Sequence, residues 1–292
     1  MHIFVQACIL GLLTGGVYAL MASGLALGFG VMRVINVAQG ALIILGAYLS
    51  YTLYGDLGLD PFVGLIVVAP AMLVLGIVLQ LVFLRPLRDE EREELSLLVT
   101  WAVALGIEGL LSVAYQTTYR STVTGYADRH WTIFGYYVSV ARVYAFAASL
   151  VVLGLLFAIL RFTKLGRAIR ATVQNPTAAR LLGIDTRLVS AIGFGLSVAT
   201  ASAAGAVYGI VFPFNPGSHY DLISRLLSII VLGGLGSLGG AVIAALFMGI
   251  SESVFSAEIS PTWSSFTFFI VLIGVLVVRP QGLFGARVRG SI

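Results

Sequence analysis

Long apolar segments separated by short polar ones run along almost the whole chain. A helix needs about 20 apolar residues to cross the hydrocarbon core of a bilayer. Segments of this kind cover residues 6–31, 38–53, 61–84, 95–115, 143–160 and 188–212, followed by a longer apolar tract over 222–255 and a last segment over 263–278. The pattern predicts an all-α polytopic membrane protein with about eight transmembrane helices, broken or re-entrant segments included.

The composition agrees with a chain that lies mostly in lipid. Hydrophobic residues make up 59% of the 292 residues and charged residues 10%, whereas a soluble domain has about 25% charged residues. We therefore expect residues 1–292 to form a single transmembrane domain. The net charge of +4 is attributed to cytoplasmic loops and does not indicate nucleic-acid binding. Because Cys8 is the only cysteine, the chain has no internal disulfide.

The apolar tract over 222–255 is interrupted by the glycine-rich sequence GGLGSLGG at positions 233–240. Each glycine costs roughly 1 kcal/mol relative to alanine inside a helix, so two half-spans with a break fit better than one helix. Non-helical backbone at membrane depth is tolerated where it is buried in protein or lines a cavity. The break is therefore either a packing crossover or part of a substrate pathway, for which the candidate residues are Gly233, Gly234 and Gly236.

Polar residues also interrupt the second span and the fourth. Asn36, Gln39 and Gly40 stand at the start of the short second span, which predicts a broken helix and adds them to the pathway candidates. Glu108 is the carboxylate expected at membrane depth. It is either a functional group or a neutral carboxyl bonded to a neighbouring helix. The three histidines are expected to lie mostly outside the membrane, which argues against a proton relay or a metal site.

The distribution of lysine and arginine predicts the orientation in the membrane, because these residues collect on the cytoplasmic side. The basic residues expected inside are Arg33, Arg85, Arg88, Arg92, Arg161, Lys164, Arg167, Arg170, Arg180, Arg187, Arg279, Arg287 and Arg289. Those left outside are Arg120, Arg129, Arg142 and Arg225. This assignment puts the N-terminus outside and the C-terminus in the cytoplasm, so the tract over 222–255 enters and returns on the outer face.

A polar, basic segment, GRAIRATVQNPTAARLLGI, occupies positions 166–184 inside the predicted cytoplasmic loop 161–187. Asn175 suits an N-cap and Pro176 the first helical position. Gly183 suits the left-handed residue after a helix. We expect a short rigid helix over 174–183, preceded by two arginines three apart on one face, Arg167 and Arg170.

This segment resembles the coupling motif of bacterial ABC importer permeases, Glu-Ala-Ala, three residues, then Gly. Here it reads Thr177, Ala178, Ala179, three residues, then Gly183, with threonine in place of the acidic residue. Residues 15–50, 228–246 and 279–285 are similar to further segments of the LivH-type permease subunit of branched-chain amino acid ABC transporters. That family usually carries Asn-Phe-Ala-His-Gly where this chain has Asn36-Val37-Ala38-Gln39-Gly40.

The resemblance implies a permease of the bacterial inner membrane that imports branched-chain amino acids or related small amino acids and amides. It implies four kinds of partner: two ABC ATPase subunits, a second LivM-type permease or another copy of this chain, an external substrate-binding protein, and the lipid bilayer. The chain lacks the P-loop sequence G-x-x-x-x-G-K-[ST], so ATP and Mg²⁺ are expected on the ATPase subunits and this chain is not itself an enzyme. An ion-coupled secondary transporter or a channel is the alternative, since broken helices fit those classes as well.

Overall fold

The computed structural model describes residues 2–32, 34–87, 92–127, 129–133, 135–279 and 282–283. Its helices are α1 (His2–Met32), α2 (Gln39–Leu57), α3 (Pro61–Leu79, continued by the π-helical turn Gln80–Leu84), α4 (Arg92–Tyr115), α5 (Val140–Phe162), α6 (Lys164–Gln174), α7 (Pro176–Leu181), α8 (Thr186–Val211), α9 (His219–Gly233), α10 (Leu238–Glu258) and α11 (Phe266–Val278). Two short strands, β1 (His130–Ile133) and β2 (Tyr136–Ser139), and the 3₁₀ turns Pro216–Ser218 and Pro261–Trp263 complete these elements. The predicted spans are confirmed as helices.

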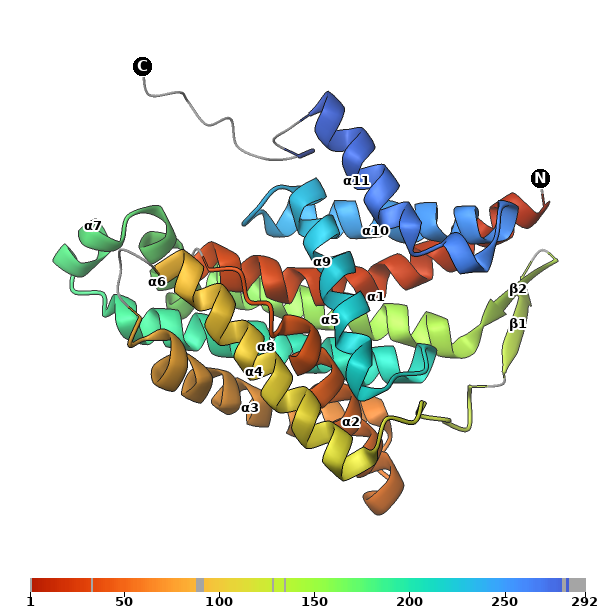
Figure 1. The fold of residues 1–292 in the computed structure, drawn as a ribbon, viewed down its shortest axis with the longest axis horizontal. Helices are drawn as coiled ribbons and strands as arrows, with labels where there is room; N and C mark the ends of the chain where they lie inside the picture. The colour runs from red at the N-terminus through yellow and green to blue at the C-terminus, as the bar shows by residue number, and fades with distance from the viewer. Residues whose placement is uncertain are drawn as a thin grey trace.

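Six helices in the described part of the chain are long and apolar enough to cross a membrane: α1, α3 with its π-helical turn, α4, α5, α8 and α10. Helices α2 and α9 are partial spans, and α11 is an apolar helix of 13 residues. In Figure 1, α1, α5, α8 and α10 run along the long axis of the molecule. Helices α6 and α7 lie at one end, which we call the α7 end. The start of α1 and the strands β1 and β2 lie at the opposite end, which we call the hairpin end.

Small residues bring the central helices into backbone contact. Helix α10 runs antiparallel to α1, with Gly249 beside Gly15. A Cβ atom on Gly249 would lie 2.5 Å from the Gly15 Cα. The Gly11/Gly15 spacing is therefore used for close helix packing, as small-xxx-small faces are in membranes. A second close crossing joins α2 and α8 at Gly46 and Gly205.

Helix α2 begins inside the bundle, as predicted for a broken span. After α1 ends at Met32, the chain turns back, and Gln39 lies beside Gly24. Gly24 is about two helical turns before the end of α1. A Cβ atom on Gly24 would lie 2.8 Å from the Gln39 Nε2. The helix has 19 residues because it continues past the apolar stretch to a left-handed cap at Gly58.

Helix α9 also begins inside the bundle and meets the start of α2. A Cβ atom on Gly40 would lie 2.5 Å from the carbonyl oxygen of His219. The two partial helices then run in opposite directions. Helix α2 runs toward the hairpin end, where the Tyr54 hydroxyl donates to the carbonyl oxygen of Val123 over 3.1 Å. Helix α9 runs toward the α7 end, so two helix N-termini meet in the interior of the membrane domain.

The glycine-rich break is confirmed between α9 and α10. Gly234 and Gly236 have φ angles of +90° and +80°, which only glycine adopts readily. The break lies beside Gly30, near the last turn of α1, and thus at the α7 end rather than halfway through the bundle. Because α10 returns antiparallel to α1, the tract over 222–255, which begins with α9 in the interior, ends at the hairpin end.

The β-hairpin between α4 and α5 was not predicted from the sequence. Strands β1 and β2 pair antiparallel, with His130 opposite Ser139. A two-stranded hairpin is marginally stable alone. The Gln6 side chain of α1 stabilises this one by accepting a hydrogen bond from the Tyr137 backbone N–H at 3.1 Å and donating to the Tyr137 carbonyl oxygen. The membrane-spanning part remains all-α.

Candidate functional site

The helix expected over 174–183 is shorter in the structure, because α7 runs over Pro176–Leu181 and Gln174 ends α6, but the predicted caps are present. The side chain of Asn175 caps α7 by accepting a hydrogen bond from the Ala178 backbone N–H at 3.0 Å. Pro176 occupies the first turn, and Gly183 follows the helix with a φ of +80°. These caps fix both ends of α7, which lies between α6 and α8 in the chain.

Helix α7 exposes most of its surface at the end of the bundle (Figure 1). Leu181 is 84% exposed and Leu182 80% exposed, which is unusual for adjacent leucines outside the apolar spans. Thr177 and Ala178 are exposed, whereas Ala179 is buried and holds α7 against its neighbours. Exposed apolar side chains beside polar ones are typical of a protein-docking surface.

The arginines of this segment differ in their environments. Arg167 and Arg170 are both exposed, and Arg170 turns back to donate a hydrogen bond to the carbonyl oxygen of Leu160 in α5. Arg85, Arg180 and Arg187 line one open cavity of about 530 Å³ at the α7 end. Arg33, Arg88, Arg287, Arg289 and four positions of the C-terminal signature, 280, 281, 284 and 285, lie outside the described residues.

The polar residues at the start of α2 are packed in the core. Asn36 and Gln39 are at most 1% exposed, and the Asn36 Nδ2 donates to the Gln39 Oε1 over 3.2 Å. The Thr100 hydroxyl of α4 accepts from the Val37 backbone N–H at 3.2 Å. The Asn36 Oδ1 and Gln39 Nε2 have no hydrogen-bond partner among the described residues. A buried unpaired polar group costs about 1–3 kcal/mol. Packing alone therefore does not explain why these two unpaired atoms are buried here.

Glu108 of α4 contacts two side chains of the neighbouring helix α9. Its Oε2 lies 3.1 Å from the Nε2 of His219 and accepts a hydrogen bond from the Tyr220 hydroxyl at 2.8 Å. His219 is 2% exposed and lies inside the helix bundle, although the histidines were expected mostly outside the membrane. Both partners stand in the first turn of α9, and the positive end of a helix dipole favours a carboxylate there.

A second charged cluster lies where sequence reasoning expected none. Arg225 was assigned to the outer side, but its side chain is only 15% exposed and forms an ion pair with Glu252 of α10. Its Nη1 donates to the Tyr18 hydroxyl at 2.9 Å, and its Nε donates to the Asp221 Oδ2 at 2.7 Å. Glu108 is therefore not the only carboxylate at membrane depth. The signal in the sequence was the pair Asp221 and Arg225, four apart in an apolar tract, which favours an ion pair on one helix face.

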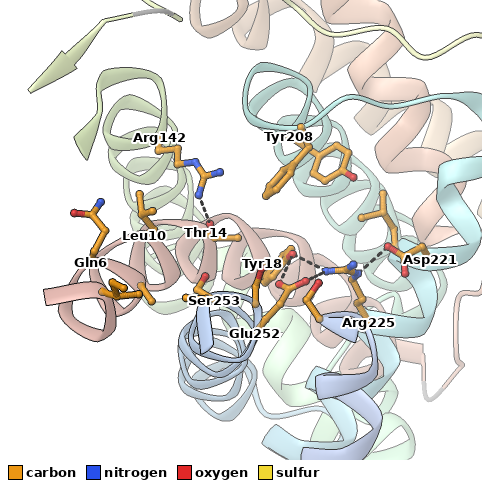
Figure 2. Close-up of a pocket in the computed structure, with 17 residues that line it drawn as sticks. Gln6, Leu10, Thr14, Tyr18, Arg142, Tyr208, Asp221, Arg225, Glu252 and Ser253 are labelled. Carbon is orange, nitrogen blue, oxygen red and sulfur yellow. Dashed lines mark hydrogen bonds and ion pairs between the residues drawn. The ribbon is translucent and has the colours of Figure 1, made fainter. Parts of the chain in front are cut away.

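This cluster forms one wall of a cavity of about 480 Å³ (Figure 2). Helices α1 and α10 cross beneath the cavity, and α5, α8 and α9 surround it. On the α5 side, Arg142 reaches the Thr14 hydroxyl at 3.5 Å. Gln6, which holds the hairpin, also lines the cavity, so the cavity extends toward the hairpin end. None of the sequence-based pathway candidates lines it.

Comparisons with known proteins identify the family of this chain. Residues 8–276 match a family model described as "Branched-chain amino acid transport system / permease component". The LivH high-affinity branched-chain amino acid transport system permease of Escherichia coli K12 is 31% identical, covering 97% of this chain and 96% of the relative. BraD of Pseudomonas aeruginosa, which has the same description, is 28% identical over 97% of this chain and 96% of its own length.

A more distant relative and a solved structure were also found. A probable LivH permease of Methanocaldococcus jannaschii is 28% identical, covering 91% of this chain and 88% of the relative. The solved structure is PsaBC from Streptococcus pneumoniae in complex with Fab. It is 13% identical to this chain with a TM-score of 0.44, and the match covers 97% of this chain and 94% of that chain. These matches do not favour the carrier or channel alternative. This chain belongs to the branched-chain amino acid transport permease family.

Proposed function

We propose that this chain is the transmembrane permease subunit of an ATP-driven importer for branched-chain amino acids or related small amino acids and amides. The family match and the names of the relatives support the class of transporter and substrate. The single structural observation that carries the proposal is the pair of exposed leucines on α7, Leu181 and Leu182. A membrane subunit that exposes apolar side chains beyond its spans presents them to a protein partner.

In this proposal α7 inserts into a groove on an ABC ATPase subunit. Two such subunits bind ATP and Mg²⁺, and the chain itself has no catalytic role. The proposed coupling residues are Arg167, Arg170, Asn175, Pro176, Thr177, Ala178, Ala179 and Gly183. Asn175 and Gly183 define the ends of α7, and Ala179 holds it in place. Thr177 and the exposed leucines contact the ATPase. Movement of the ATPase subunits is thereby passed to α6 and α8.

The α7 end faces the cytoplasm of a bacterial inner membrane in this proposal, and the N-terminus faces outward. The cluster of arginines around the cavity at the α7 end supports this orientation, because basic residues favour the cytoplasmic side. A substrate-binding protein then docks at the hairpin end, and a LivM-type permease or a second copy of this chain completes the membrane part. The C-terminus is also placed in the cytoplasm.

The substrate pathway is proposed to pass the interior N-termini of α2 and α9. The unpaired amide atoms of Asn36 and Gln39 support this, since a conformational change can turn them toward a substrate. Half-helix termini near the midplane commonly supply polar groups to substrates. The remaining residues proposed to line the pathway are Gly40, Glu108, Gly233, Gly234 and Gly236.

We expect replacement of Leu181 with glutamate to separate the chain from its ATPase. The substitution places a charge in the proposed apolar contact with the ATPase subunit. Loss of a central apolar anchor costs about 2 kcal/mol or more of binding free energy, which is more than tenfold in affinity for the ATPase. Recovery of the ATPase subunit with the solubilised chain should therefore fall at least about tenfold, and uptake of radiolabelled leucine by cells should fall with it.

The matched control is Leu57→Glu, which changes an exposed leucine at the end of α2, far from α7. This control should keep ATPase recovery near the wild-type value. Equal recovery and uptake in Leu181→Glu and wild type would show that α7 is not the coupling element.

A further inference from the structure

We infer that the 480 Å³ cavity of Figure 2 binds a zwitterionic α-amino acid, with the α-carboxylate on Arg142 and the α-ammonium facing the acidic wall formed by Asp221 and Glu252. The inference deepens the proposed function, on which its choice of substrate rests. It adds a site on the hairpin side of the membrane domain and the chemical class of ligand that the site takes.

The size and position of the cavity suit a small polar ligand. Ligand sites usually measure about 300–1,000 Å³ and combine apolar walls with a few placed polar groups. Here Ala7, Leu10 and Leu222 supply apolar surface beside the charged groups. Charged side chains at membrane depth are costly and typically mark a substrate pathway. A cavity that gathers several of them needs an explanation beyond packing.

Arg142 is the unpaired cation of this cavity. Its contacts are the Thr14 hydroxyl at 3.5 Å and the face of the Phe212 ring, whose centroid is 5.9 Å from the guanidinium carbon. No carboxylate among the described residues lies within ion-pair distance of it. The guanidinium fork matches a carboxylate in a bidentate geometry. Arg142 is therefore equipped to receive an anionic group that the protein itself does not provide.

Arg225 is the paired cation, and its partners leave negative charge in excess. Its nitrogens donate to Asp221, Tyr18, Glu252 and the Ser265 hydroxyl. One positive charge thus faces two carboxylates. The Asp221 side chain is 55% exposed and uses one oxygen, Oδ2, for Arg225. This wall can accept hydrogen bonds from an ammonium group.

The cavity therefore has one positively charged side and one negatively charged side. The α5 side carries the positive charge of Arg142, and the side formed by α9 and α10 carries a net negative charge. Arg142 of α5 and Glu252 of α10 line the same cavity. A neutral ligand with separated charges matches both sides at once, whereas an amine or a carboxylic acid alone matches only one.

Labelling of a cysteine in the cavity tests this site directly. Ser253 lines the cavity, and Cys8 is the only native cysteine. Ser253→Cys in a Cys8→Ser background therefore gives one reporter thiol, to be labelled with a water-soluble charged methanethiosulfonate in the assembled complex. At about ten times its Kd, leucine should slow labelling about tenfold, because only the free site reacts. Leucinamide, which keeps the ammonium but lacks the carboxylate, should not slow labelling.

Arg142→Gln should remove the protection by leucine, and Arg142→Lys should retain part of it. The matched control is Arg129→Gln, which removes an exposed charge next to the hairpin and outside the cavity. It should leave protection unchanged. If Arg142→Gln does not fold, the comparison of leucine with leucinamide in the protein with native Arg142 still decides the question.

Absence of labelling, absence of protection by leucine, or equal protection by leucinamide would each overturn the inference. Uptake of radiolabelled leucine by the complete system is measured in parallel. Protection without uptake would contradict the proposed function while supporting the site, and uptake without protection would contradict the site alone.

Discussion

Replacing Gly205 with valine is expected to abolish the folded protein in the membrane. At the crossing of α2 and α8, a Cβ atom on Gly205 would overlap the carbonyl oxygen of Ile43 and lie 2.8 Å from the backbone nitrogen of Ala47. Both obstacles are backbone atoms of a helix, so they cannot rotate away as a side chain would. Overpacking in a core that can adjust costs about 1–3 kcal/mol, and we expect a larger cost here because two central helices must separate.

The measurement is the yield of monodisperse protein after solubilisation, together with the temperature at which it aggregates. Gly154→Val is the matched control, because Gly154 lies within α5 and a Cβ atom there meets nothing within 4 Å. The control should behave like the wild type. Normal yield and stability of Gly205→Val would mean that the α2–α8 crossing is looser than the structure indicates.

The second large effect is expected from Glu252→Ala, which leaves Arg225 without its buried ion-pair partner. Removing one member of a buried pair typically costs about 3–5 kcal/mol, and we expect the lower end of this range because Arg225 keeps its ion pair with Asp221. The Tyr18 hydroxyl loses its acceptor as well, since it donates to the Glu252 Oε2 at 2.8 Å. At about 2–4 °C per kcal/mol, the apparent Tm should fall by about 10 °C.

Two further variants separate the loss of the pair from a general effect of the substitution. Glu258→Ala removes an exposed carboxylate at the end of the same helix and should leave the apparent Tm unchanged. Arg225→Met combined with Glu252→Leu should recover much of the lost stability, because apolar replacement of a whole buried pair is often neutral or stabilising. An apparent Tm of Glu252→Ala equal to that of the wild type would show that the pair does not stabilise the protein.

Local features of the sequence predicted the helices and the ends of α7. An apolar stretch of sufficient length forms a helix in lipid because every backbone hydrogen bond must be made within the segment. Asn175, Pro176 and Gly183 act on neighbouring backbone groups, so their roles follow from sequence order alone. The same holds for Gly234 and Gly236, whose positive φ angles end α9 where the glycine-rich pattern predicted a break.

The contacts between distant segments were not predictable in this way. Glu108 meets His219, and Tyr18 meets Glu252, although each pair is separated by more than a hundred positions in the chain. A single sequence shows which residues are charged but not which helices are neighbours. Reasoning from sequence therefore named no partner for Glu108 and assigned Arg225 to the outer side.

The sequence by itself thus determined the membrane class, the helical segments, the two breaks and the ends of the short helix α7, because these depend on interactions between residues close in the chain. Only the tertiary structure decided that α2 and α9 begin in the interior, that the glycine-rich break lies at the α7 end, and that Arg142 shares a cavity with Asp221 and Glu252. These depend on which helices pack together, and that packing is decided by close contacts such as the one between Gly15 and Gly249, which lie far apart in the sequence.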